Sequence, residues 1–138
     1  MPPVDINYGA VVLAAILHMA IGMAWYSRAL FGTIWVKALG KNNKELEAMK
    51  KDVGRAYILS FAGALLMAYV LAYLLDLLVV INAAQGTQFG FLLWLGFVVT
   101  TGSATVLFEG RPKAFFYINN AYTLISLMAM GGLLAAWS

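Results

Sequence analysis

Four stretches of the chain are apolar and free of charged side chains, and each is long enough to cross a bilayer. They cover residues 6–27, 56–75, 86–108 and 114–137. A helix needs about 20 apolar residues to span roughly 30 Å of hydrocarbon. The stretches lack the apolar-polar alternation of a membrane barrel, and backbone groups in lipid must be paired within the segment. The pattern predicts an all-α membrane protein, a four-transmembrane-helix bundle forming a single domain over residues 1–138.

The long segment between the first two spans has patterns of its own. Residues 30–36 are too apolar for a free loop and too few to span, so we expect them to lie at the membrane interface with their tryptophan at headgroup level. A short helix is predicted from Asn43, which is a good N-cap. Leu46, Met49 and Val53 form one apolar stripe on it, suited to the membrane surface. This amphipathic segment is either a docking surface for anionic lipid or a partner, or a solvated linker.

The composition agrees with a membrane protein. Hydrophobic residues make up 63% of the 138 residues and charged residues only 11%, whereas a soluble domain carries about 25% charged residues. A soluble enzyme, a nucleic-acid-binding module and a disordered tail are therefore excluded. The chain has no cysteine, so it has no disulfide, thiolate nucleophile or Cys-ligated metal.

The basic residues predict the orientation. All nine lie in two loops, seven between the first two spans and two between the last two, while the opposite side carries only Asp5 and Asp76. By the positive-inside rule both basic loops are cytoplasmic and both termini are outside, in a cell membrane of the inner or plasma type. The first span has no basic leader and is too long for a signal-peptide core, so we expect it to be retained.

His18 is the one ionisable residue in the middle of a span, where polar groups are costly and are usually functional. It lies ten residues before Arg28, which places it about 15 Å from the cytoplasmic boundary, near the bilayer centre. Ala14, Gly22 and Trp25 share its helix face. The small residues on that face favour close packing against a neighbouring helix.

Three interpretations of His18 remain open. It is a neutral histidine held by a hydroxyl or carbonyl inside the bundle, a proton-relay or substrate contact in a transporter, or a haem or metal ligand that needs a second ligand. Thr100 and Thr101 on the third span lie at a similar depth. We expect one of these hydroxyls to satisfy a ring nitrogen.

A second group of polar and aromatic side chains lies where the spans reach the basic side. Its members are Trp25, Tyr26, Arg28, Tyr57, Ser60, Ser103, Thr105, Glu109, Tyr117, Asn119 and Asn120. An unpaired amide at the depth of Asn120 costs several kcal/mol, so Asn120 should face a partner. We expect Glu109 to pair with Arg28, which makes the first and third helices neighbours, with Asn119 or Asn120 in the same space. The group is either a pocket for a headgroup or small solute, or an interhelical hydrogen-bond network.

The candidate polar site therefore consists of seven residues: His18, Trp25, Tyr26, Arg28, Glu109, Asn119 and Asn120. No phosphate loop, zinc-ligand set or catalytic triad motif is present, so we predict no catalytic residue, metal ligand or cofactor. The favoured function is a structural or accessory protein that binds lipid or a partner, as a homo-oligomer or a subunit of a membrane complex, without nucleic acid. The alternatives are a small dimeric transporter or channel that uses His18, and a membrane enzyme or cofactor protein.

Several short motifs resemble a known family. They are Gly22-Met23-Ala24-Trp25-Tyr26-Ser27 with Leu30-Phe31-Gly32 and Trp35, then Gly90 with Trp94-Leu95-Gly96-Phe97, Phe108-Glu109-Gly110-Arg111-Pro112, and Asn119-Asn120-Ala121-Tyr122. Together they resemble the domain of unknown function 1761 family, over most of the chain. The resemblance implies a small bacterial-type membrane protein of four helices. It implies no activity.

Overall fold

The computed structural model describes residues 4–27, 30, 32–110 and 112–137. All regular structure in these residues is helical. The long helices are α1 (Tyr8–Trp25), α4 (Val53–Leu77), the run of α5 (Ala83–Leu93), η1 (Trp94–Val98) and α6 (Val99–Glu109), and α7 (Lys113–Trp137), and the short ones are α2 (Gly32–Leu39) and α3 (Asn43–Lys51).

Four helical segments are long and apolar enough to cross a membrane, namely Tyr8–Trp25, Val53–Leu77, Ala83–Glu109 and Phe116–Trp137. They correspond to the four predicted spans, and the short helices α2 and α3 lie in the loop between the first two. The predicted fold class, an all-α membrane protein with four helices of spanning length, is confirmed. The third span differs in detail, because five of its residues form a π-helical turn, η1, between α5 and α6.

Asparagine side chains begin three of the helices. Asn7 accepts a hydrogen bond from the backbone of Ala10 at 3.1 Å, and Asn82 accepts one from Gln85 at 2.8 Å. The N-cap of α3 is Asn42, which accepts from the N–H of Glu45 at 2.8 Å. The prediction of Asn43 as the cap was wrong by one residue, because it is the Asn42 oxygen that reaches the otherwise unpaired N–H three residues on.

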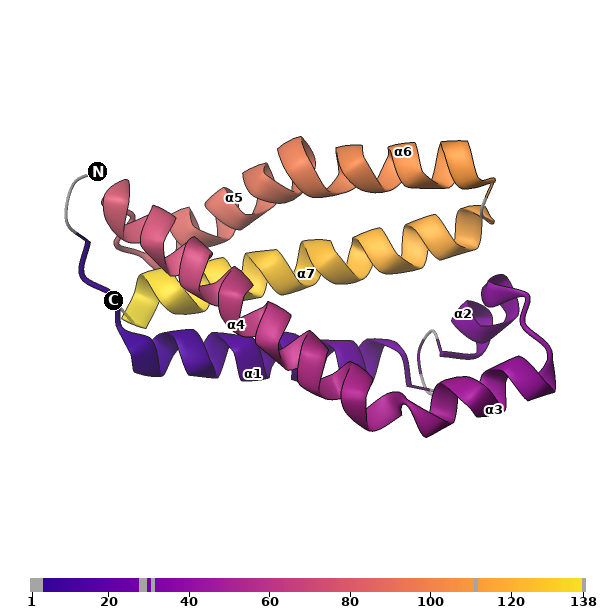
Figure 1. The fold of residues 1–138 in the computed structure, drawn as a ribbon. Coiled ribbons are helices and arrows are strands. Elements are labelled where there is room, and N and C mark those ends of the chain that lie inside the picture. Colours follow the sequence, from indigo (N-terminus) through magenta and orange to yellow (C-terminus); the bar gives the residue numbers. More distant parts are fainter. Residues whose placement is uncertain (1–3, 28–29, 31, 111, 138) are drawn as a thin grey trace.

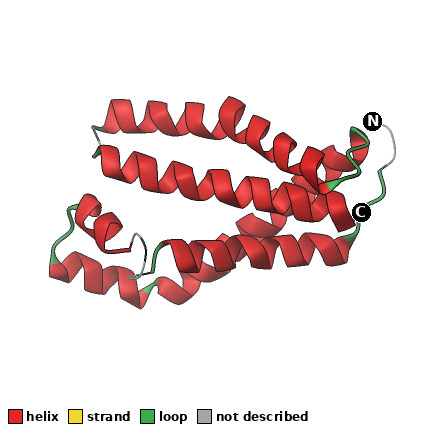
Figure 2. Cartoon of the chain, turned by 180° about the vertical axis from the view of Figure 1, so that it is seen from behind, coloured by secondary structure: helices red, strands yellow, loops and turns green. Residues whose placement is uncertain are grey.

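Helix α7 is the central helix of the fold. It packs against α5 on one side and against α1 and α4 on the other (Figure 1). Both ends of the chain lie at one end of the molecule, where the Asp5 N–H donates to Asp76 at 2.8 Å. Seen from behind, the short helices α2 and α3 lie at the opposite end, beside the α6–α7 turn (Figure 2). We call this the basic end, because Lys37, Lys41, Lys44, Lys50, Lys51, Arg55 and Lys113 are located there.

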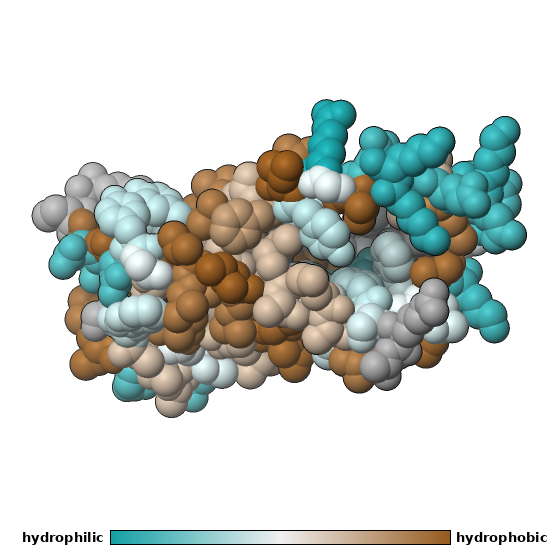
Figure 3. Space-filling model, turned by 90° about the horizontal axis from the view of Figure 1, so that it is seen from below, coloured by the Kyte–Doolittle hydropathy of each residue, from teal (hydrophilic) through white to brown (hydrophobic). Residues whose placement is uncertain are grey.

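The surface follows the same division. Hydrophilic side chains gather at the basic end, whereas brown, hydrophobic side chains cover much of the length of the molecule (Figure 3). Large apolar side chains on the long helices are exposed, including Leu107 and Phe108 of α6. The buried core contains many alanines, among them Ala14 of α1, Ala68 of α4 and Ala135 of α7. Small residues inside and large ones outside are expected where lipid rather than water covers the surface.

Glycines bring α5 and α7 into backbone contact. A Cβ atom on Gly86 would lie 2.1 Å from the carbonyl oxygen of Gly131, and one on Gly90 would lie 2.3 Å from that of Leu127. Any side chain at these positions would push the helices apart. The Gly86-x-x-x-Gly90 pair is therefore the contact surface that holds the third span against the fourth.

We predict that Gly86→Ala lowers the free energy of unfolding by about 1–3 kcal/mol, because the methyl group overlaps the Gly131 backbone. Gly63→Ala in α4 is the matched control, since a Cβ there meets nothing within 4 Å. The thermal midpoint in detergent should fall for Gly86→Ala and stay level or rise for Gly63→Ala. Equal midpoints for the two variants would contradict this packing.

Candidate functional site

His18 is held by two hydroxyl groups of α7. The Ser126 hydroxyl bonds to its Nδ1, and the Tyr122 hydroxyl lies 3.1 Å from both its Nε2 and its backbone oxygen. One neutral form satisfies all of these groups: Ser126 donates to Nδ1, Nε2–H donates to the Tyr122 oxygen, and Tyr122 donates to the carbonyl. Because Ser126 is fully buried, the histidine is tied into the interface between α1 and α7.

Glycine at position 22 makes room for this arrangement. Gly22 lies one turn after His18 on the same face of α1, and a Cβ there would be 2.8 Å from the Tyr122 hydroxyl oxygen. The rings of His18 and Tyr122 pack with centroids 5.3 Å apart. The small residue that the sequence places beside His18 thus admits the hydroxyl that satisfies it.

The threonines of the third span do not contact His18, which differs from our expectation. Thr100 donates to the carbonyl oxygen of Gly96 at 2.9 Å, and Thr101 donates to that of Val98 at 3.0 Å. Both acceptors lie in η1, where π-helical spacing disturbs the regular backbone bonds. The threonine hydroxyls therefore bond to their own helix. The sequence analysis missed Tyr122 and Ser126, whose i, i+4 spacing at a similar depth was the available signal.

The end of α1 makes two further hydrogen bonds to α7. Trp25 Nε1 donates to the carbonyl oxygen of Ile118 at 3.0 Å, and the Tyr26 hydroxyl donates to Asn119 Oδ1. Together with the contacts of His18, these bonds form a line along the interface of the two helices, which we call the α1–α7 seam. Four of the predicted site residues lie in this seam: His18, Trp25, Tyr26 and Asn119.

Asn120 faces the other side of α7. Its side chain donates to the Phe116 carbonyl at 2.8 Å and fills the space beside Gly102, where a Cβ would lie 2.9 Å from Asn120 Oδ1. The backbone carbonyl oxygen of Asn120 accepts a hydrogen bond from Trp94 Nε1 at 2.8 Å. Adjacent residues on a helix point about 100° apart. Asn119 and Asn120 therefore contact different neighbours and do not share one pocket.

The expected contact between the first and third helices is not formed in the part of the chain that the structure describes. Helix α7 lies between α1 and α6 (Figure 1). Arg28 lies outside the described residues, so its pairing with Glu109 is not described. Glu109 is the exposed last residue of α6. Asn119 and Asn120 thus belong to two separate interfaces of α7, because the fourth span and not the third packs against the first.

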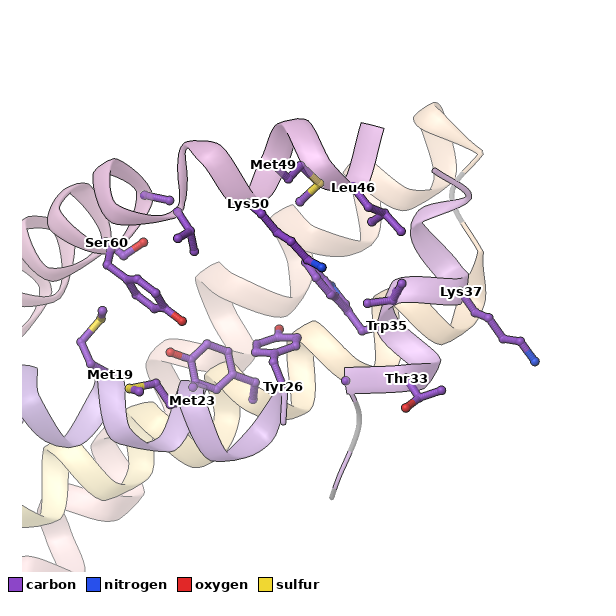
Figure 4. A pocket seen from close by; sticks show the side chains of 17 residues that line it. Met19, Met23, Tyr26, Thr33, Trp35, Lys37, Leu46, Met49, Lys50 and Ser60 are labelled. Atoms are coloured by element: carbon purple, nitrogen blue, oxygen red, sulfur yellow. The ribbon is translucent and has the colours of Figure 1, made fainter. Parts of the chain in front are cut away.

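A cavity of about 950 Å³ lies at the basic end, between the end of α1, the short helices α2 and α3, and the start of α4. Methionines, aromatic rings, hydroxyl groups and two lysines line it (Figure 4). Tyr26 and Tyr122 of the seam form part of its wall, whereas His18 is not among its lining residues. The cavity is within the usual size range of ligand pockets, about 300–1,000 Å³.

The walls of this cavity are not equally well held. On one side the α1–α7 seam satisfies its polar groups. On the other, Trp35 of α2 packs edge-on against Tyr26 with centroids 5.2 Å apart, while its enclosed indole nitrogen has no hydrogen-bond partner among the described residues. An enclosed, unpaired donor costs about 1–3 kcal/mol. Helix α3 buries none of its side chains, so the α2–α3 wall is the weaker one.

The apolar stripe of α3 lines this cavity. Leu46, Met49 and Val53 all belong to its wall, although we expected them to lie on the membrane surface. Helix α4 starts at Val53, directly after α3, which holds the stripe over the end of α1. The sequence thus identified the stripe, whereas the way the chain continues from α3 into α4 turns the stripe toward the cavity.

An apolar groove of about 450 Å³ adjoins the cavity between α1 and α4. The two share Met19, Met23 and Tyr57, and the groove continues along α1 to Ile16 and along α4 to Phe61. It therefore runs from the basic end toward the middle of the predicted membrane span. Among the described residues, Tyr57 is the one polar side chain that lines it.

These features define an all-helical membrane protein with four apolar helices of spanning length. The family described as protein of unknown function (DUF1761) matches residues 9–135, and the chain belongs to this family. Comparison with curated proteins and with solved structures finds no match.

We predict that Tyr122→Phe lowers the free energy of unfolding by about 1 kcal/mol or more, because it removes the hydroxyl that bonds to both the ring and the carbonyl of His18. Tyr117→Phe on the same helix is the control, since that residue is 65% exposed. Thermal unfolding in detergent measures both. An equal loss in the two variants would show that the seam contributes little stability.

Proposed function

We propose that this protein binds a membrane lipid, with the polar part of the lipid in the cavity at the basic end and an acyl chain in the groove between α1 and α4. The function is one of binding and not of catalysis. The lipid enters from the leaflet that faces the basic loops, which we propose to be the cytoplasmic leaflet of a cell membrane.

The observation that carries the proposal is the junction of cavity and groove. They share Met19, Met23 and Tyr57, so a cavity that carries lysine and hydroxyl groups among apolar side chains opens into a groove that is almost wholly apolar. A phospholipid has the same division, with a polar head at the interface and a hydrocarbon chain below it. A small polar solute bound in the cavity would leave the apolar groove unfilled.

The chemistry of the lining supports the same ligand. Methionine side chains are flexible and adapt to irregular apolar shapes, and Met19, Met23 and Met49 line the cavity. The hydroxyls of Tyr57 and Ser60 supply hydrogen-bonding groups on the α4 side. Since α3 buries no side chain of its own, its apolar stripe gains burial when a lipid chain fills the cavity.

The transporter alternative draws no support from His18. Both of its ring nitrogens bond to hydroxyls of α7, and it does not line the cavity. A metal or haem ligand at this position would have to displace those bonds. In the described part of the chain no three His, Asp or Glu side chains gather as metal ligands. Assembly as a homo-oligomer or accessory subunit stays a prediction.

The orientation is tested with single cysteines, since the chain has none of its own. We expect Ile81→Cys, in an exposed position between α4 and α5, to react with a membrane-impermeant maleimide in intact cells. Lys44→Cys in α3 should react only after the membrane is opened, because positive loops stay in the cytoplasm. The reverse pattern would overturn the proposed orientation.

Lipid binding is tested by filling the cavity. We expect Ala56→Trp to copurify with about one lipid molecule fewer per chain than the wild type, because the indole takes up ligand space. Ala62→Trp makes the same change at an exposed position of α4 outside the cavity and groove. Native mass spectrometry in a mild detergent counts the retained lipids, and size-exclusion chromatography checks that both variants are folded. Equal lipid retention in all three proteins would refute the proposal.

A further inference from the structure

We infer that the cavity selects phospholipids with a net negative headgroup and that Lys50 is the residue that selects them. This inference rests on the proposed lipid binding and names the class of lipid. It concerns one lysine among the several at the basic end, because the side chain of Lys50 extends into the cavity.

Lys50 extends from α3 across the cavity toward Trp35 on α2, whereas Lys37 extends away from it (Figure 4). The position follows from helix geometry. Leu46 lies one turn before Lys50 on the same face of α3, and that face lines the cavity. Lys51, the next residue, points about 100° away and is not part of the lining.

The charge around this lysine favours an anion. Among the residues that the structure describes, no acidic side chain lines the cavity, and the ionic groups in its wall are those of Lys37 and Lys50. Much of the remaining wall is apolar, as with Leu46 and Val53. Lys50 is exposed, so a lipid phosphate can reach it. A lipid that fills the cavity would exclude water beside these apolar walls, and the attraction between Lys50 and the phosphate would then be screened less. A zwitterionic headgroup would bring a second positive charge, together with its phosphate, into a cavity that Lys50 already makes positive.

The position also places a phosphate on the side of the cavity that lies away from the apolar groove. Lys50 lines the cavity near its α2–α3 side, and the apolar groove begins on the opposite side, at Met19 and Met23. A phosphate at Lys50 therefore leaves its acyl chain directed along α1 into the groove. Surface lysines attract anionic lipids without fixing a chain in this way.

The test compares Lys50→Gln with Lys44→Gln, which removes the same charge from the same helix outside the cavity. Each purified protein is mixed with equal amounts of phosphatidylglycerol and phosphatidylcholine that carry the same acyl chains. Native mass spectrometry then gives the ratio of the two bound lipids. We expect Lys50→Gln to lose about fivefold in its preference for phosphatidylglycerol, while Lys44→Gln and Lys50→Arg keep the preference of the wild type.

Failure of this inference is distinguishable from failure of the proposed function. If Ala56→Trp loses its lipid but Lys50→Gln and Lys44→Gln show equal preference, the cavity binds lipid and Lys50 does not select it. If Lys50→Gln binds both lipids less in the same proportion, Lys50 contributes to occupancy alone, and the inferred selection is wrong. If Ala56→Trp retains as much lipid as Ala62→Trp, the proposed site itself is wrong.

Discussion

The hydrogen bonds between His18 and the hydroxyls of Tyr122 and Ser126 fix how α1 lies against α7. A polar group inside a bilayer has no water to bond with, so it must find its partners within the protein. Once His18 is satisfied, the rotation and register of α1 are set along its whole length. Trp25 and Tyr26 then reach Ile118 and Asn119 at its far end. Tyr26 in turn packs against Trp35, which positions α2 and with it the cavity.

Helix α7 has two faces of different character. The face toward α1 carries hydroxyl and amide groups, whereas the face toward α5 carries glycine and meets Gly86 and Gly90 at backbone distance. Hydrogen bonds fix the orientation of α1 against α7, and close van der Waals contact between backbones holds α5 against α7. Toward the basic end α6 lies farther from α7 than α5 does (Figure 1), and Asn120 beside Gly102 fills part of that space.

The cavity forms where this tight packing stops. Its α1–α7 wall is held by the seam, while its α2–α3 wall buries few groups and gives the Trp35 nitrogen no partner within the part of the chain that the structure describes. A rigid wall beside a weakly held one is suited to a ligand that enters sideways from the bilayer. The groove between α1 and α4 provides such an entry. The α1–α7 seam and the α5–α7 contact thus stabilise the fold, while the proposed binding takes place at the cavity and the groove.

The sequence by itself determined the four spans, the short helix α3 and the separation of basic from apolar segments, because each depends on local periodicity and charge. It also indicated that His18 needs partners and that small residues surround it. Only the tertiary structure decided that those partners are Tyr122 and Ser126 instead of Thr100 or Thr101, and that α7 separates α1 from α6. Depth in the membrane follows from residue counting along each helix. Which helices are neighbours, and which face each one presents, depends on packing among all of them. Hydroxyl groups at the same depth on the third and fourth spans are therefore equally good candidates for the partner of His18 from the sequence alone.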